Sequence, residues 1–489
     1  MSIDRKPEFG AVSLDRTADM DDARKVASRR ELLRAGCGFG QLALLWMLLQ
    51  DGALGSAQRR KAAPSSGLPP KRKARADAVI FLFMQGGPSH IDLFDPKPLL
   101  NRRAGQPLPT SIFRSRPVHT RPILASPRTF RKYGKSGMTI SDLYPLVGQQ
   151  ADHLCLIRSC VSESANHAPA IQEINTGSFR FGRPSLGAWS LYGLGSVNKN
   201  LPGFVVLTGD QDPVHRPEAW GAGFLSPRFE GITLKPDNPP MANIDPPPGM
   251  SRERARATLD FVGELNRRYR VGKEDVADLE ARTAAYELAF RMQSSAHQVV
   301  DFSRESVATR KLYGLDDPVT EEFGKRCLVA RRLVERGVRF VQVYCGHENG
   351  WDAHDRMGEK YPEICARTDR PVAGLLADLA ARGMLERTLV IWGGEFGRTP
   401  TSISGTGRDH NPTGYSMWLA GGGAAGGRVI GATDDFGMWA EDEPCHVNDL
   451  HATILHLIGL ETSEITVHVN GRDEHPTVKG GSVIAKALA

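Results

Sequence analysis

Two apolar segments of this chain each lead into residues that can bind a metal. Residues 389–392 stop at two glycines, and Glu395 follows directly. Residues 338–345 precede the sequence GWDAHD, which contains Asp352 and His354. In an α/β sheet, ligands bind in the loops at the carboxyl ends of the strands. The two segments therefore predict a metal-assisted site between neighbouring strand ends.

Further candidate ligands follow the same pattern. His410 lies in the sequence GRDHNP, shortly after Glu395, and His90 and Asp92 follow the apolar run 78–84. Mixed oxygen and nitrogen donors suit zinc, manganese or iron better than calcium, which prefers oxygen alone. The alternative is structural: His90 and Asp92 could instead make turn hydrogen bonds to the backbone.

Two residues are candidates for catalysis. His167 precedes Pro169, which marks a helix start, and a helix N-terminus suits an anion or a nucleophile. A turn with an uninvolved histidine is the alternative. Arg398, three residues after Glu395, could meet an anionic substrate bidentately or form an ion pair with Glu395.

The elements that must position these residues alternate between strand and helix. Apolar runs of strand length occur at 78–84, 154–157, 204–207, 338–345, 389–392 and 415–419, and helical patterns at 321–336, 371–382 and 447–458. This alternation predicts a doubly wound α/β fold with a mostly parallel sheet flanked by helices. Residues 101–140 are rich in proline and arginine and are expected to form a long ordered loop. Residues 251–312 predict a helical insertion of two or three helices, either a cap over the site or a peripheral addition.

The N-terminus predicts an export signal. Ser28-Arg29-Arg30-Glu31-Leu32-Leu33 resembles a twin-arginine motif. The apolar stretch 42–49 is too short for a stable transmembrane anchor, which needs about 20 residues. Residues 1–57 are therefore expected to be a signal region that engages the twin-arginine export machinery, giving a periplasmic or extracellular protein. A short amphipathic helix with a chance arginine pair is the alternative.

Composition is ordinary for a globular protein, with 40% hydrophobic and 24% charged residues. The net charge of +6 is concentrated in residues 58–76, which are expected to be a flexible linker before an α/β domain at 77–489. Nucleic-acid binding is not expected, because the basic residues are not interleaved with aromatic ones. Seven cysteines include no CxxC pair, so a thiolate zinc site is not indicated, although disulfides are permitted.

The order of these motifs resembles the alkaline phosphatase superfamily, which includes sulfatases, phosphopentomutase and cofactor-independent phosphoglycerate mutase. The phrases TLVIWGGEFG, GWDAHD, GRDHNPTGYSMWLAG and VNDLHATILHLIGL carry the resemblance. A more specific likeness, through MQGGPSHIDLFDPKP and GGEFGRTP, is to the domain of unknown function 1501, a sulfatase-like family.

The resemblance implies a metal-dependent hydrolase of phosphate or sulfate esters, acting on a small-molecule or glycan ester. Asp352, His354 and His410 would hold one divalent metal. Glu395, with His90 or Asp92, would complete that site or hold a second metal. His167 would be a ligand, a general base or a nucleophile.

The chain also departs from the superfamily pattern. Gln85 stands where the first strand usually delivers a metal-binding aspartate, and Phe396 stands in place of a metal-binding histidine. No CxPSR motif occurs, and His167 takes the position of the nucleophile. These changes favour attack by water, with Ser162 and Ser164 leaving a covalent route open. They also support a rival: a non-catalytic exported binding or assembly protein that retains the fold.

Overall fold

The computed structural model describes residues 73–109, 121–209, 218–271, 277–345 and 350–489. The predicted signal region 1–57 and most of the predicted linker lie outside these residues. The described end of the linker packs on the body of the protein, because Arg75 and Ala76 both donate their backbone N–H to the carbonyl oxygen of Leu457. Within the described part of the chain, no helix combines the length and apolar character that crossing a membrane requires.

A nine-stranded mixed sheet forms the centre of the molecule, which confirms the predicted fold class. Its strands run in the order β12-β4-β11-β8-β1-β7-β5-β6, with β15 paired to β4. Their bounds are β1 Ala78–Met84, β4 Leu154–Val161, β5 Phe204–Leu207, β6 Ile232–Leu234, β7 Phe340–Cys345, β8 Thr388–Gly393, β11 Tyr415–Ala420, β12 Arg428–Ile430 and β15 Cys445–His446. The pairing is parallel except at β11, which runs antiparallel to both β8 and β4.

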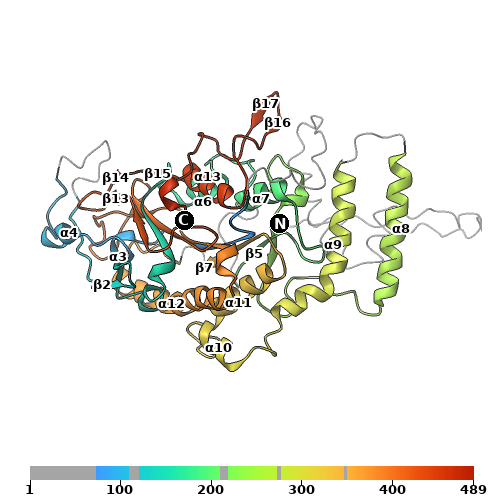
Figure 1. Cartoon of the computed structure of the whole chain (residues 1–489), viewed down its shortest axis with the longest axis horizontal. Coiled ribbons are helices and arrows are strands. Elements are labelled where there is room, and N and C mark those ends of the chain that lie inside the picture. Colours follow the sequence, from blue (N-terminus) through green and yellow to red (C-terminus); the bar gives the residue numbers. More distant parts are fainter. Residues whose placement is uncertain (1–72, 110–120, 210–217, 272–276, 346–349) are drawn as a thin grey trace, which may run out of the picture.

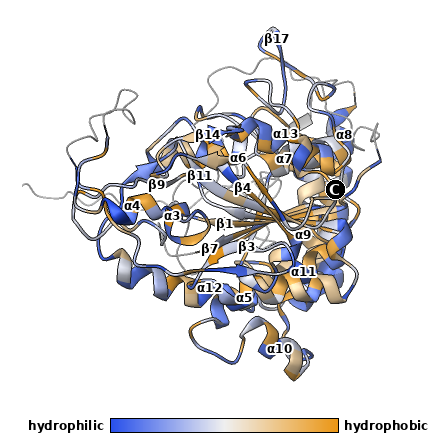
Figure 2. Ribbon diagram, turned by 60° about the vertical axis from the view of Figure 1, so that its left-hand side comes forward, coloured by the Kyte–Doolittle hydropathy of each residue, from blue (hydrophilic) through white to orange (hydrophobic). Residues whose placement is uncertain are grey.

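Helices cover both faces of this sheet. One face carries α5 (Pro145–Gly148), α11 (Glu321–Glu335) and α12 (Met357–Ala381), and the other carries α6 (His167–Thr176), α7 (Leu186–Leu194) and α13 (Val447–Leu457) (Figures 1 and 2). The predicted helix at 371–382 is thus the second half of a longer one. Pro362 and Pro371 both lie inside α12, whose buried face continues on both sides of Pro371.

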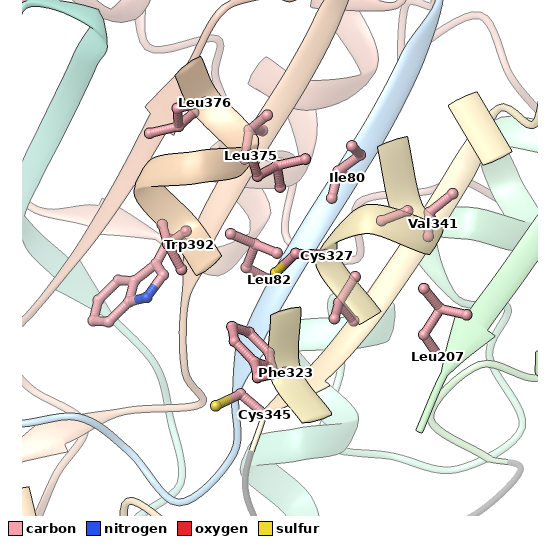
Figure 3. Close-up of a cluster of buried hydrophobic side chains, with 14 of the residues drawn as sticks. Ile80, Leu82, Leu207, Phe323, Cys327, Val341, Cys345, Leu375, Leu376 and Trp392 are labelled. Carbon is pink, nitrogen blue, oxygen red and sulfur yellow. The ribbon is translucent and has the colours of Figure 1, made fainter. Parts of the chain in front are cut away.

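The burial of the central strand β1 on both faces explains why its sequence is an unbroken apolar run. All seven of its residues are buried. Ile80, Leu82 and Met84 point into one core, and Val79, Phe81 and Phe83 into the other. Successive side chains of a strand alternate between faces, so a strand covered on both sides must be apolar throughout. Figure 3 shows Ile80 and Leu82 among side chains that include Cys327 of α11 and Leu375 of α12.

The helical insertion is present, and it does not cover the site. It consists of α8 (Arg252–Arg270), α9 (Ala277–Val300) and α10 (Val307–Tyr313). Arg291 of α9 donates to the carbonyl oxygen of Lys199, at 2.7 Å, in the segment that precedes β5. In Figure 1, α8 and α9 lie at the opposite end of the molecule from α3 (His90–Leu93), which follows the carboxyl end of β1. The cap alternative is therefore excluded by the position of these helices.

Smaller elements surround the carboxyl ends of the strands. They are α4 (Pro98–Arg102), the hairpin β2 (Phe130–Tyr133) and β3 (Met138–Ser141), β9 (Gly397–Arg398) with β10 (His410–Asn411), and β13 (Ala432–Thr433) with β14 (Ala440–Asp442). A further hairpin pairs β16 (Val467–Val469) with β17 (Arg472–Glu474). The described part of segment 101–140 is thus not a plain loop. Residues 130–140 form most of the β2–β3 hairpin around Gly134 and Gly137, both with positive φ.

We predict that Leu82→Ala lowers the free energy of unfolding by about 2–5 kcal/mol, because it removes a fully buried side chain from the central strand. Equilibrium urea unfolding would measure the change. The control is Val307→Ala on α10, where the side chain is 78% exposed and the expected change is below about 0.5 kcal/mol. Equal effects of the two substitutions would contradict this account of the core.

Candidate metal centre

Four segments that are distant in sequence meet at the carboxyl ends of the parallel strands. The loop after β7 carries Asp352 and His354, and β8 leads into Glu395. The loop after β4 leads into α6, whose first residue is His167. The short pairing of β9 with β10 places His410 opposite Arg398. The sheet thus brings these predicted residues into one place.

Three imidazole rings surround the carboxylate of Asp352; they belong to His167, His354 and His410. The Nε2 atom of His167 lies 3.1 Å from Oδ2 of Asp352. The Nε2 atoms of His354 and His410 each lie 3.1 Å from Oδ1, and they are 2.9 Å from one another. One side of the group is open, because the side chain of His354 is 47% exposed whereas those of His167 and His410 are 14% and 16% exposed.

The other nitrogen of each ring has an acceptor of its own. Nδ1 of His167 lies 2.8 Å from Oε1 of Glu395, and Nδ1 of His354 lies 3.2 Å from Oδ1 of Asp409. Nδ1 of His410 lies 2.6 Å from the carbonyl oxygen of Ala165. A carbonyl oxygen can only accept, so Nδ1 of His410 carries the proton. All three rings turn Nδ1 outward to an acceptor and Nε2 toward Asp352, which is the orientation of histidines that bind metals.

The electrostatics of this group fit a cation at its centre. Burial, with the charges of Arg398 and His167, lowers the pKa of His410, so this ring is neutral at pH 7 and its Nε2 presents a lone pair. Burial opposes ionisation of Asp352, but its contacts with His167, His410 and Arg398 hold its pKa well below the usual range. A neutral Nε2 would repel a carboxylate oxygen 3.1 Å away unless positive charge lies between them.

Arg398 is fully buried and supports Asp352 from behind. Its Nη2 lies 2.7 Å from Oδ1 of Asp352, and its Nε donates to the carbonyl oxygen of Gly87 at 2.8 Å. Its Nη1 donates to the carbonyl oxygen of Arg408, and its Nη2 donates to those of Gly86 and Trp351. With its donors engaged by backbone, Arg398 holds Asp352 in place. Neither the expected bidentate substrate contact nor an ion pair with Glu395 matches these contacts.

Glu395 is also fully buried, and it holds His167. Its two carboxylate oxygens accept the backbone N–H of Gly86, at 2.9 and 3.2 Å, and Oε1 accepts Nδ1–H of His167. Glycine is required where the backbone after β1 passes close to Glu395 and Phe396. Gly86 and Gly87 have positive φ, 112° and 77°. A Cβ on Gly87 would also lie 2.5 Å from the ring of Phe396.

The structure does not bring His90 or Asp92 into this group. Nε2 of His90 lies 2.8 Å from the carbonyl oxygen of Gly437, and burial lowers the pKa of His90 to about 4. Asp92 accepts from Nε of Arg408 at 2.8 Å. Both residues are buried in α3; His90 contacts a backbone carbonyl, whereas Asp92 pairs with a side chain rather than making the turn hydrogen bond considered above.

Phe396 closes one wall of the centre. Its ring packs against that of His410, with centroids 4.4 Å apart, and against that of His167, with centroids 5.0 Å apart. The side chain is buried. The apolar ring itself supplies no metal ligand at this position.

Sequence reasoning did not assign a supporting role to Asp409 or to Ala165. Asp409 orients His354 and itself pairs with Arg121, and Ala165 orients His410 through its carbonyl oxygen. The sequence shows Asp409 beside His410, which could have indicated a supporting role. No sequence signal marks a backbone carbonyl.

In the metal-free protein we predict that His167 titrates at about pH 9. Burial lowers its pKa, but hydrogen bonds with Asp352 and Glu395 outweigh burial and raise the pKa to about 9. A histidine with a raised folded-state pKa stabilises the fold below its ordinary value of about 6.5, and this contribution is lost as the pH rises through about 9. Imidazole NMR titration of the metal-free protein and of His167→Gln would assign the midpoint. A midpoint below 6.5 would contradict this prediction.

Comparison with known proteins gives one family and several distant structures. The model of a family described as "Protein of unknown function (DUF1501)" matches residues 76–488. The PsFucS1 sulfatase from Pseudoalteromonas sp. is 13% identical with a TM-score of 0.35, and the match covers 80% of this chain and 68% of that one. The phosphonate monoester hydrolase SpPMH from Silicibacter pomeroyi is 12% identical with a TM-score of 0.35, covering 71% of both chains.

The alkaline phosphatase from the Antarctic bacterium TAB5 is 13% identical with a TM-score of 0.29, covering 71% of this chain and 92% of that one. At these identities the likeness concerns the fold alone. No curated protein matches this chain. The family match extends over the whole described domain and includes every residue of the centre, so this chain belongs to the DUF1501 family.

Proposed function

We propose that this protein is an exported, metal-dependent hydrolase of phosphate or sulfate esters. The observation that carries the proposal is the orientation of the three imidazoles, each with Nδ1 on an acceptor and Nε2 toward one carboxylate. In metal sites such outer partners fix the tautomer and make the ligand more basic. The twin-arginine-like motif at Arg29 and Arg30 supports export.

The donor set fits a divalent transition metal. His167, Asp352 and His410 offer ligand atoms that all lie within 4.8 Å of one another. His354 is the exposed fourth donor, on the side from which water and substrate would enter. Imidazole nitrogen with one carboxylate suits zinc, manganese or iron. When bound, such an ion would polarise the ester oxygen and neutralise negative charge during displacement.

The chain's own residues would bind and orient the anionic ester. The N-terminus of α6 begins at His167, and its N-cap, Asn166, makes no side-chain cap hydrogen bond. The first backbone N–H groups of a helix, together with its dipole, favour an anion at that point. Arg398 keeps Asp352 ionised, and Glu395 keeps the ring of His167 in place.

Water is the proposed nucleophile. Both nitrogens of His167 face carboxylates, so the ring is not free to attack the ester. Ser162 donates from Oγ to the carbonyl oxygen of Glu395 at 3.3 Å, and Ser164 donates to that of Asn166 at 3.4 Å. These contacts favour a structural role for both hydroxyls. A small-molecule or glycan ester is the proposed substrate class.

A non-catalytic binding protein is the second candidate, and Phe396 favours it. The ring fills the place where a second metal ligand would stand in the superfamily pattern. A site with one metal and an apolar wall could hold an anionic group of a glycan or protein without turnover. Saturable binding of a sulfated or phosphorylated glycan, with no release of sulfate or phosphate, would support this candidate over the hydrolase.

We predict one equivalent of transition metal per chain, and a loss of affinity of more than about 100-fold in His410→Ala and Asp352→Asn. The expectation is larger than the 10–100-fold typical of outer-shell changes, because these substitutions remove ligands. Elemental mass spectrometry and chelator competition would measure both quantities. His468→Ala, on the exposed β16–β17 hairpin, is the control and should bind as the wild type does. A wild-type protein that binds no metal after reloading would overturn the proposal.

Metal-loaded protein should also hydrolyse an aryl phosphate or aryl sulfate, and Asp352→Asn should abolish that activity. Turnover should fall as the pH is lowered, because protons compete with the metal for the imidazole nitrogens. Activity that survives in Asp352→Asn would mean that the hydrolysis occurs elsewhere or comes from a contaminant.

A further inference from the structure

A second group of ionisable side chains lies beside the candidate metal centre. It consists of Glu163, in the loop before α6, Glu173 on α6 and His446 at the start of α13, which offer ligand atoms within 4.8 Å of one another. Lys479 pairs with Glu163. The carboxylate of Glu173 is only 1% exposed, and burial raises its pKa to about 7.

The tautomer of His446 argues against a metal in this group. Its Nδ1 accepts the backbone N–H of Asn448 at 3.1 Å, as the N-cap of α13. The neutral ring therefore carries its proton on Nε2, the atom that faces the two carboxylates at 3.4 and 3.7 Å. A metal would need a lone pair on that atom. In the candidate metal centre, by contrast, Nδ1 of His410 faces a carbonyl oxygen and carries the proton, so its Nε2 is free to bind.

The contacts of Glu173 reach the metal centre through the backbone. Its Oε2 accepts the backbone N–H of Glu163 at 2.9 Å. Two residues further on, the carbonyl oxygen of Ala165 accepts Nδ1–H of His410 at 2.6 Å. On the other side, Ser162 donates its N–H to the carbonyl oxygen of Pro412 at 2.8 Å. Glu173 thus holds Glu163 near the start of the segment 162–166, which orients His410.

We propose that Glu173 is a positioning residue: it clamps the segment 162–166 so that the Ala165 carbonyl keeps His410 in its metal-binding tautomer. The inference rests on the proposed function, because it concerns the affinity of the same centre. Glu173 touches neither the ester nor the proposed ligands, so its effect must be transmitted by the Glu163 amide and the Ala165 carbonyl.

Substitutions at Glu173 separate the clamp from the negative charge. Glu173→Gln keeps an acceptor for the Glu163 amide and loses only the charge, whereas Glu173→Ala loses both. The matched control is Asp369→Ala on α12. Asp369 is also a buried carboxylate that accepts backbone N–H groups, those of Leu146 and Val147 at 3.0 and 2.8 Å, but it lies on the other face of the sheet.

The readouts are the zinc dissociation constant and stoichiometry, and the hydrogen exchange of peptides that contain residues 162–166. We expect one equivalent of zinc in every variant. Glu173→Ala should bind zinc about 10-fold more weakly and exchange faster in this segment, whereas Glu173→Gln should stay within about threefold of the wild type. Asp369→Ala should lower the melting temperature and leave zinc affinity within about threefold of the wild type.

Several results would overturn the inference. Unchanged zinc affinity in Glu173→Ala, or equal losses in the alanine and glutamine variants, would show that the clamp does not set the affinity. A second zinc equivalent that disappears in both Glu173 variants would show that the group is itself a metal site. A wild-type protein that binds none of zinc, manganese and iron would remove the proposed function. The clamp would then be tested by hydrogen exchange alone, and unchanged exchange in Glu173→Ala would overturn it.

Discussion

The pairing of buried Arg398 with Asp352 is the interaction on which the site depends. A guanidinium group that is fully buried must be balanced by charge and hydrogen bonds, because an unpaired buried charge is strongly destabilising. Here its donors bind the backbone carbonyl oxygens of Gly87 after β1, Trp351 in the loop after β7 and Arg408 just before β10. The Asp352 carboxylate balances its charge. The same contacts join three segments of the chain and fix the carboxylate around which the imidazoles gather.

The parallel sheet makes this arrangement possible. β1, β7 and β8 are neighbours and end at the same edge, so residues more than 300 positions apart in sequence, such as Gly86 and Glu395, form a hydrogen bond. Glycine at the end of β1 lets the backbone approach Glu395 and the ring of Phe396, which a Cβ on Gly87 would prevent. The apolar strands therefore provide rigidity, and the glycines provide the space in which the polar groups meet.

In the centre, three imidazoles surround the Asp352 carboxylate, and a second set of residues holds each imidazole in place. His167, His354 and His410 face Asp352, and Glu395, Asp409 and the Ala165 carbonyl each hold one ring. Glu173 belongs to a further layer, through the amide of Glu163. Phe396 gives the centre an apolar wall against the rings of His167 and His410. This combination is the basis of the proposed single-metal site.

The sequence by itself determined the fold class and indicated several of the residues that the structure brings together. Continuous apolar runs require strands buried on both faces, and residues that follow such strands meet at one edge, which is why Asp352, His354, Glu395 and His410 could be named together. The tertiary structure decided the roles. Only the folded chain shows that Arg398 is enclosed by carbonyl oxygens, that Glu395 supports His167, and that His90 and Asp92 have partners elsewhere. These outcomes depend on contacts between distant segments and on backbone carbonyls, and neither leaves a pattern in the order of residue types.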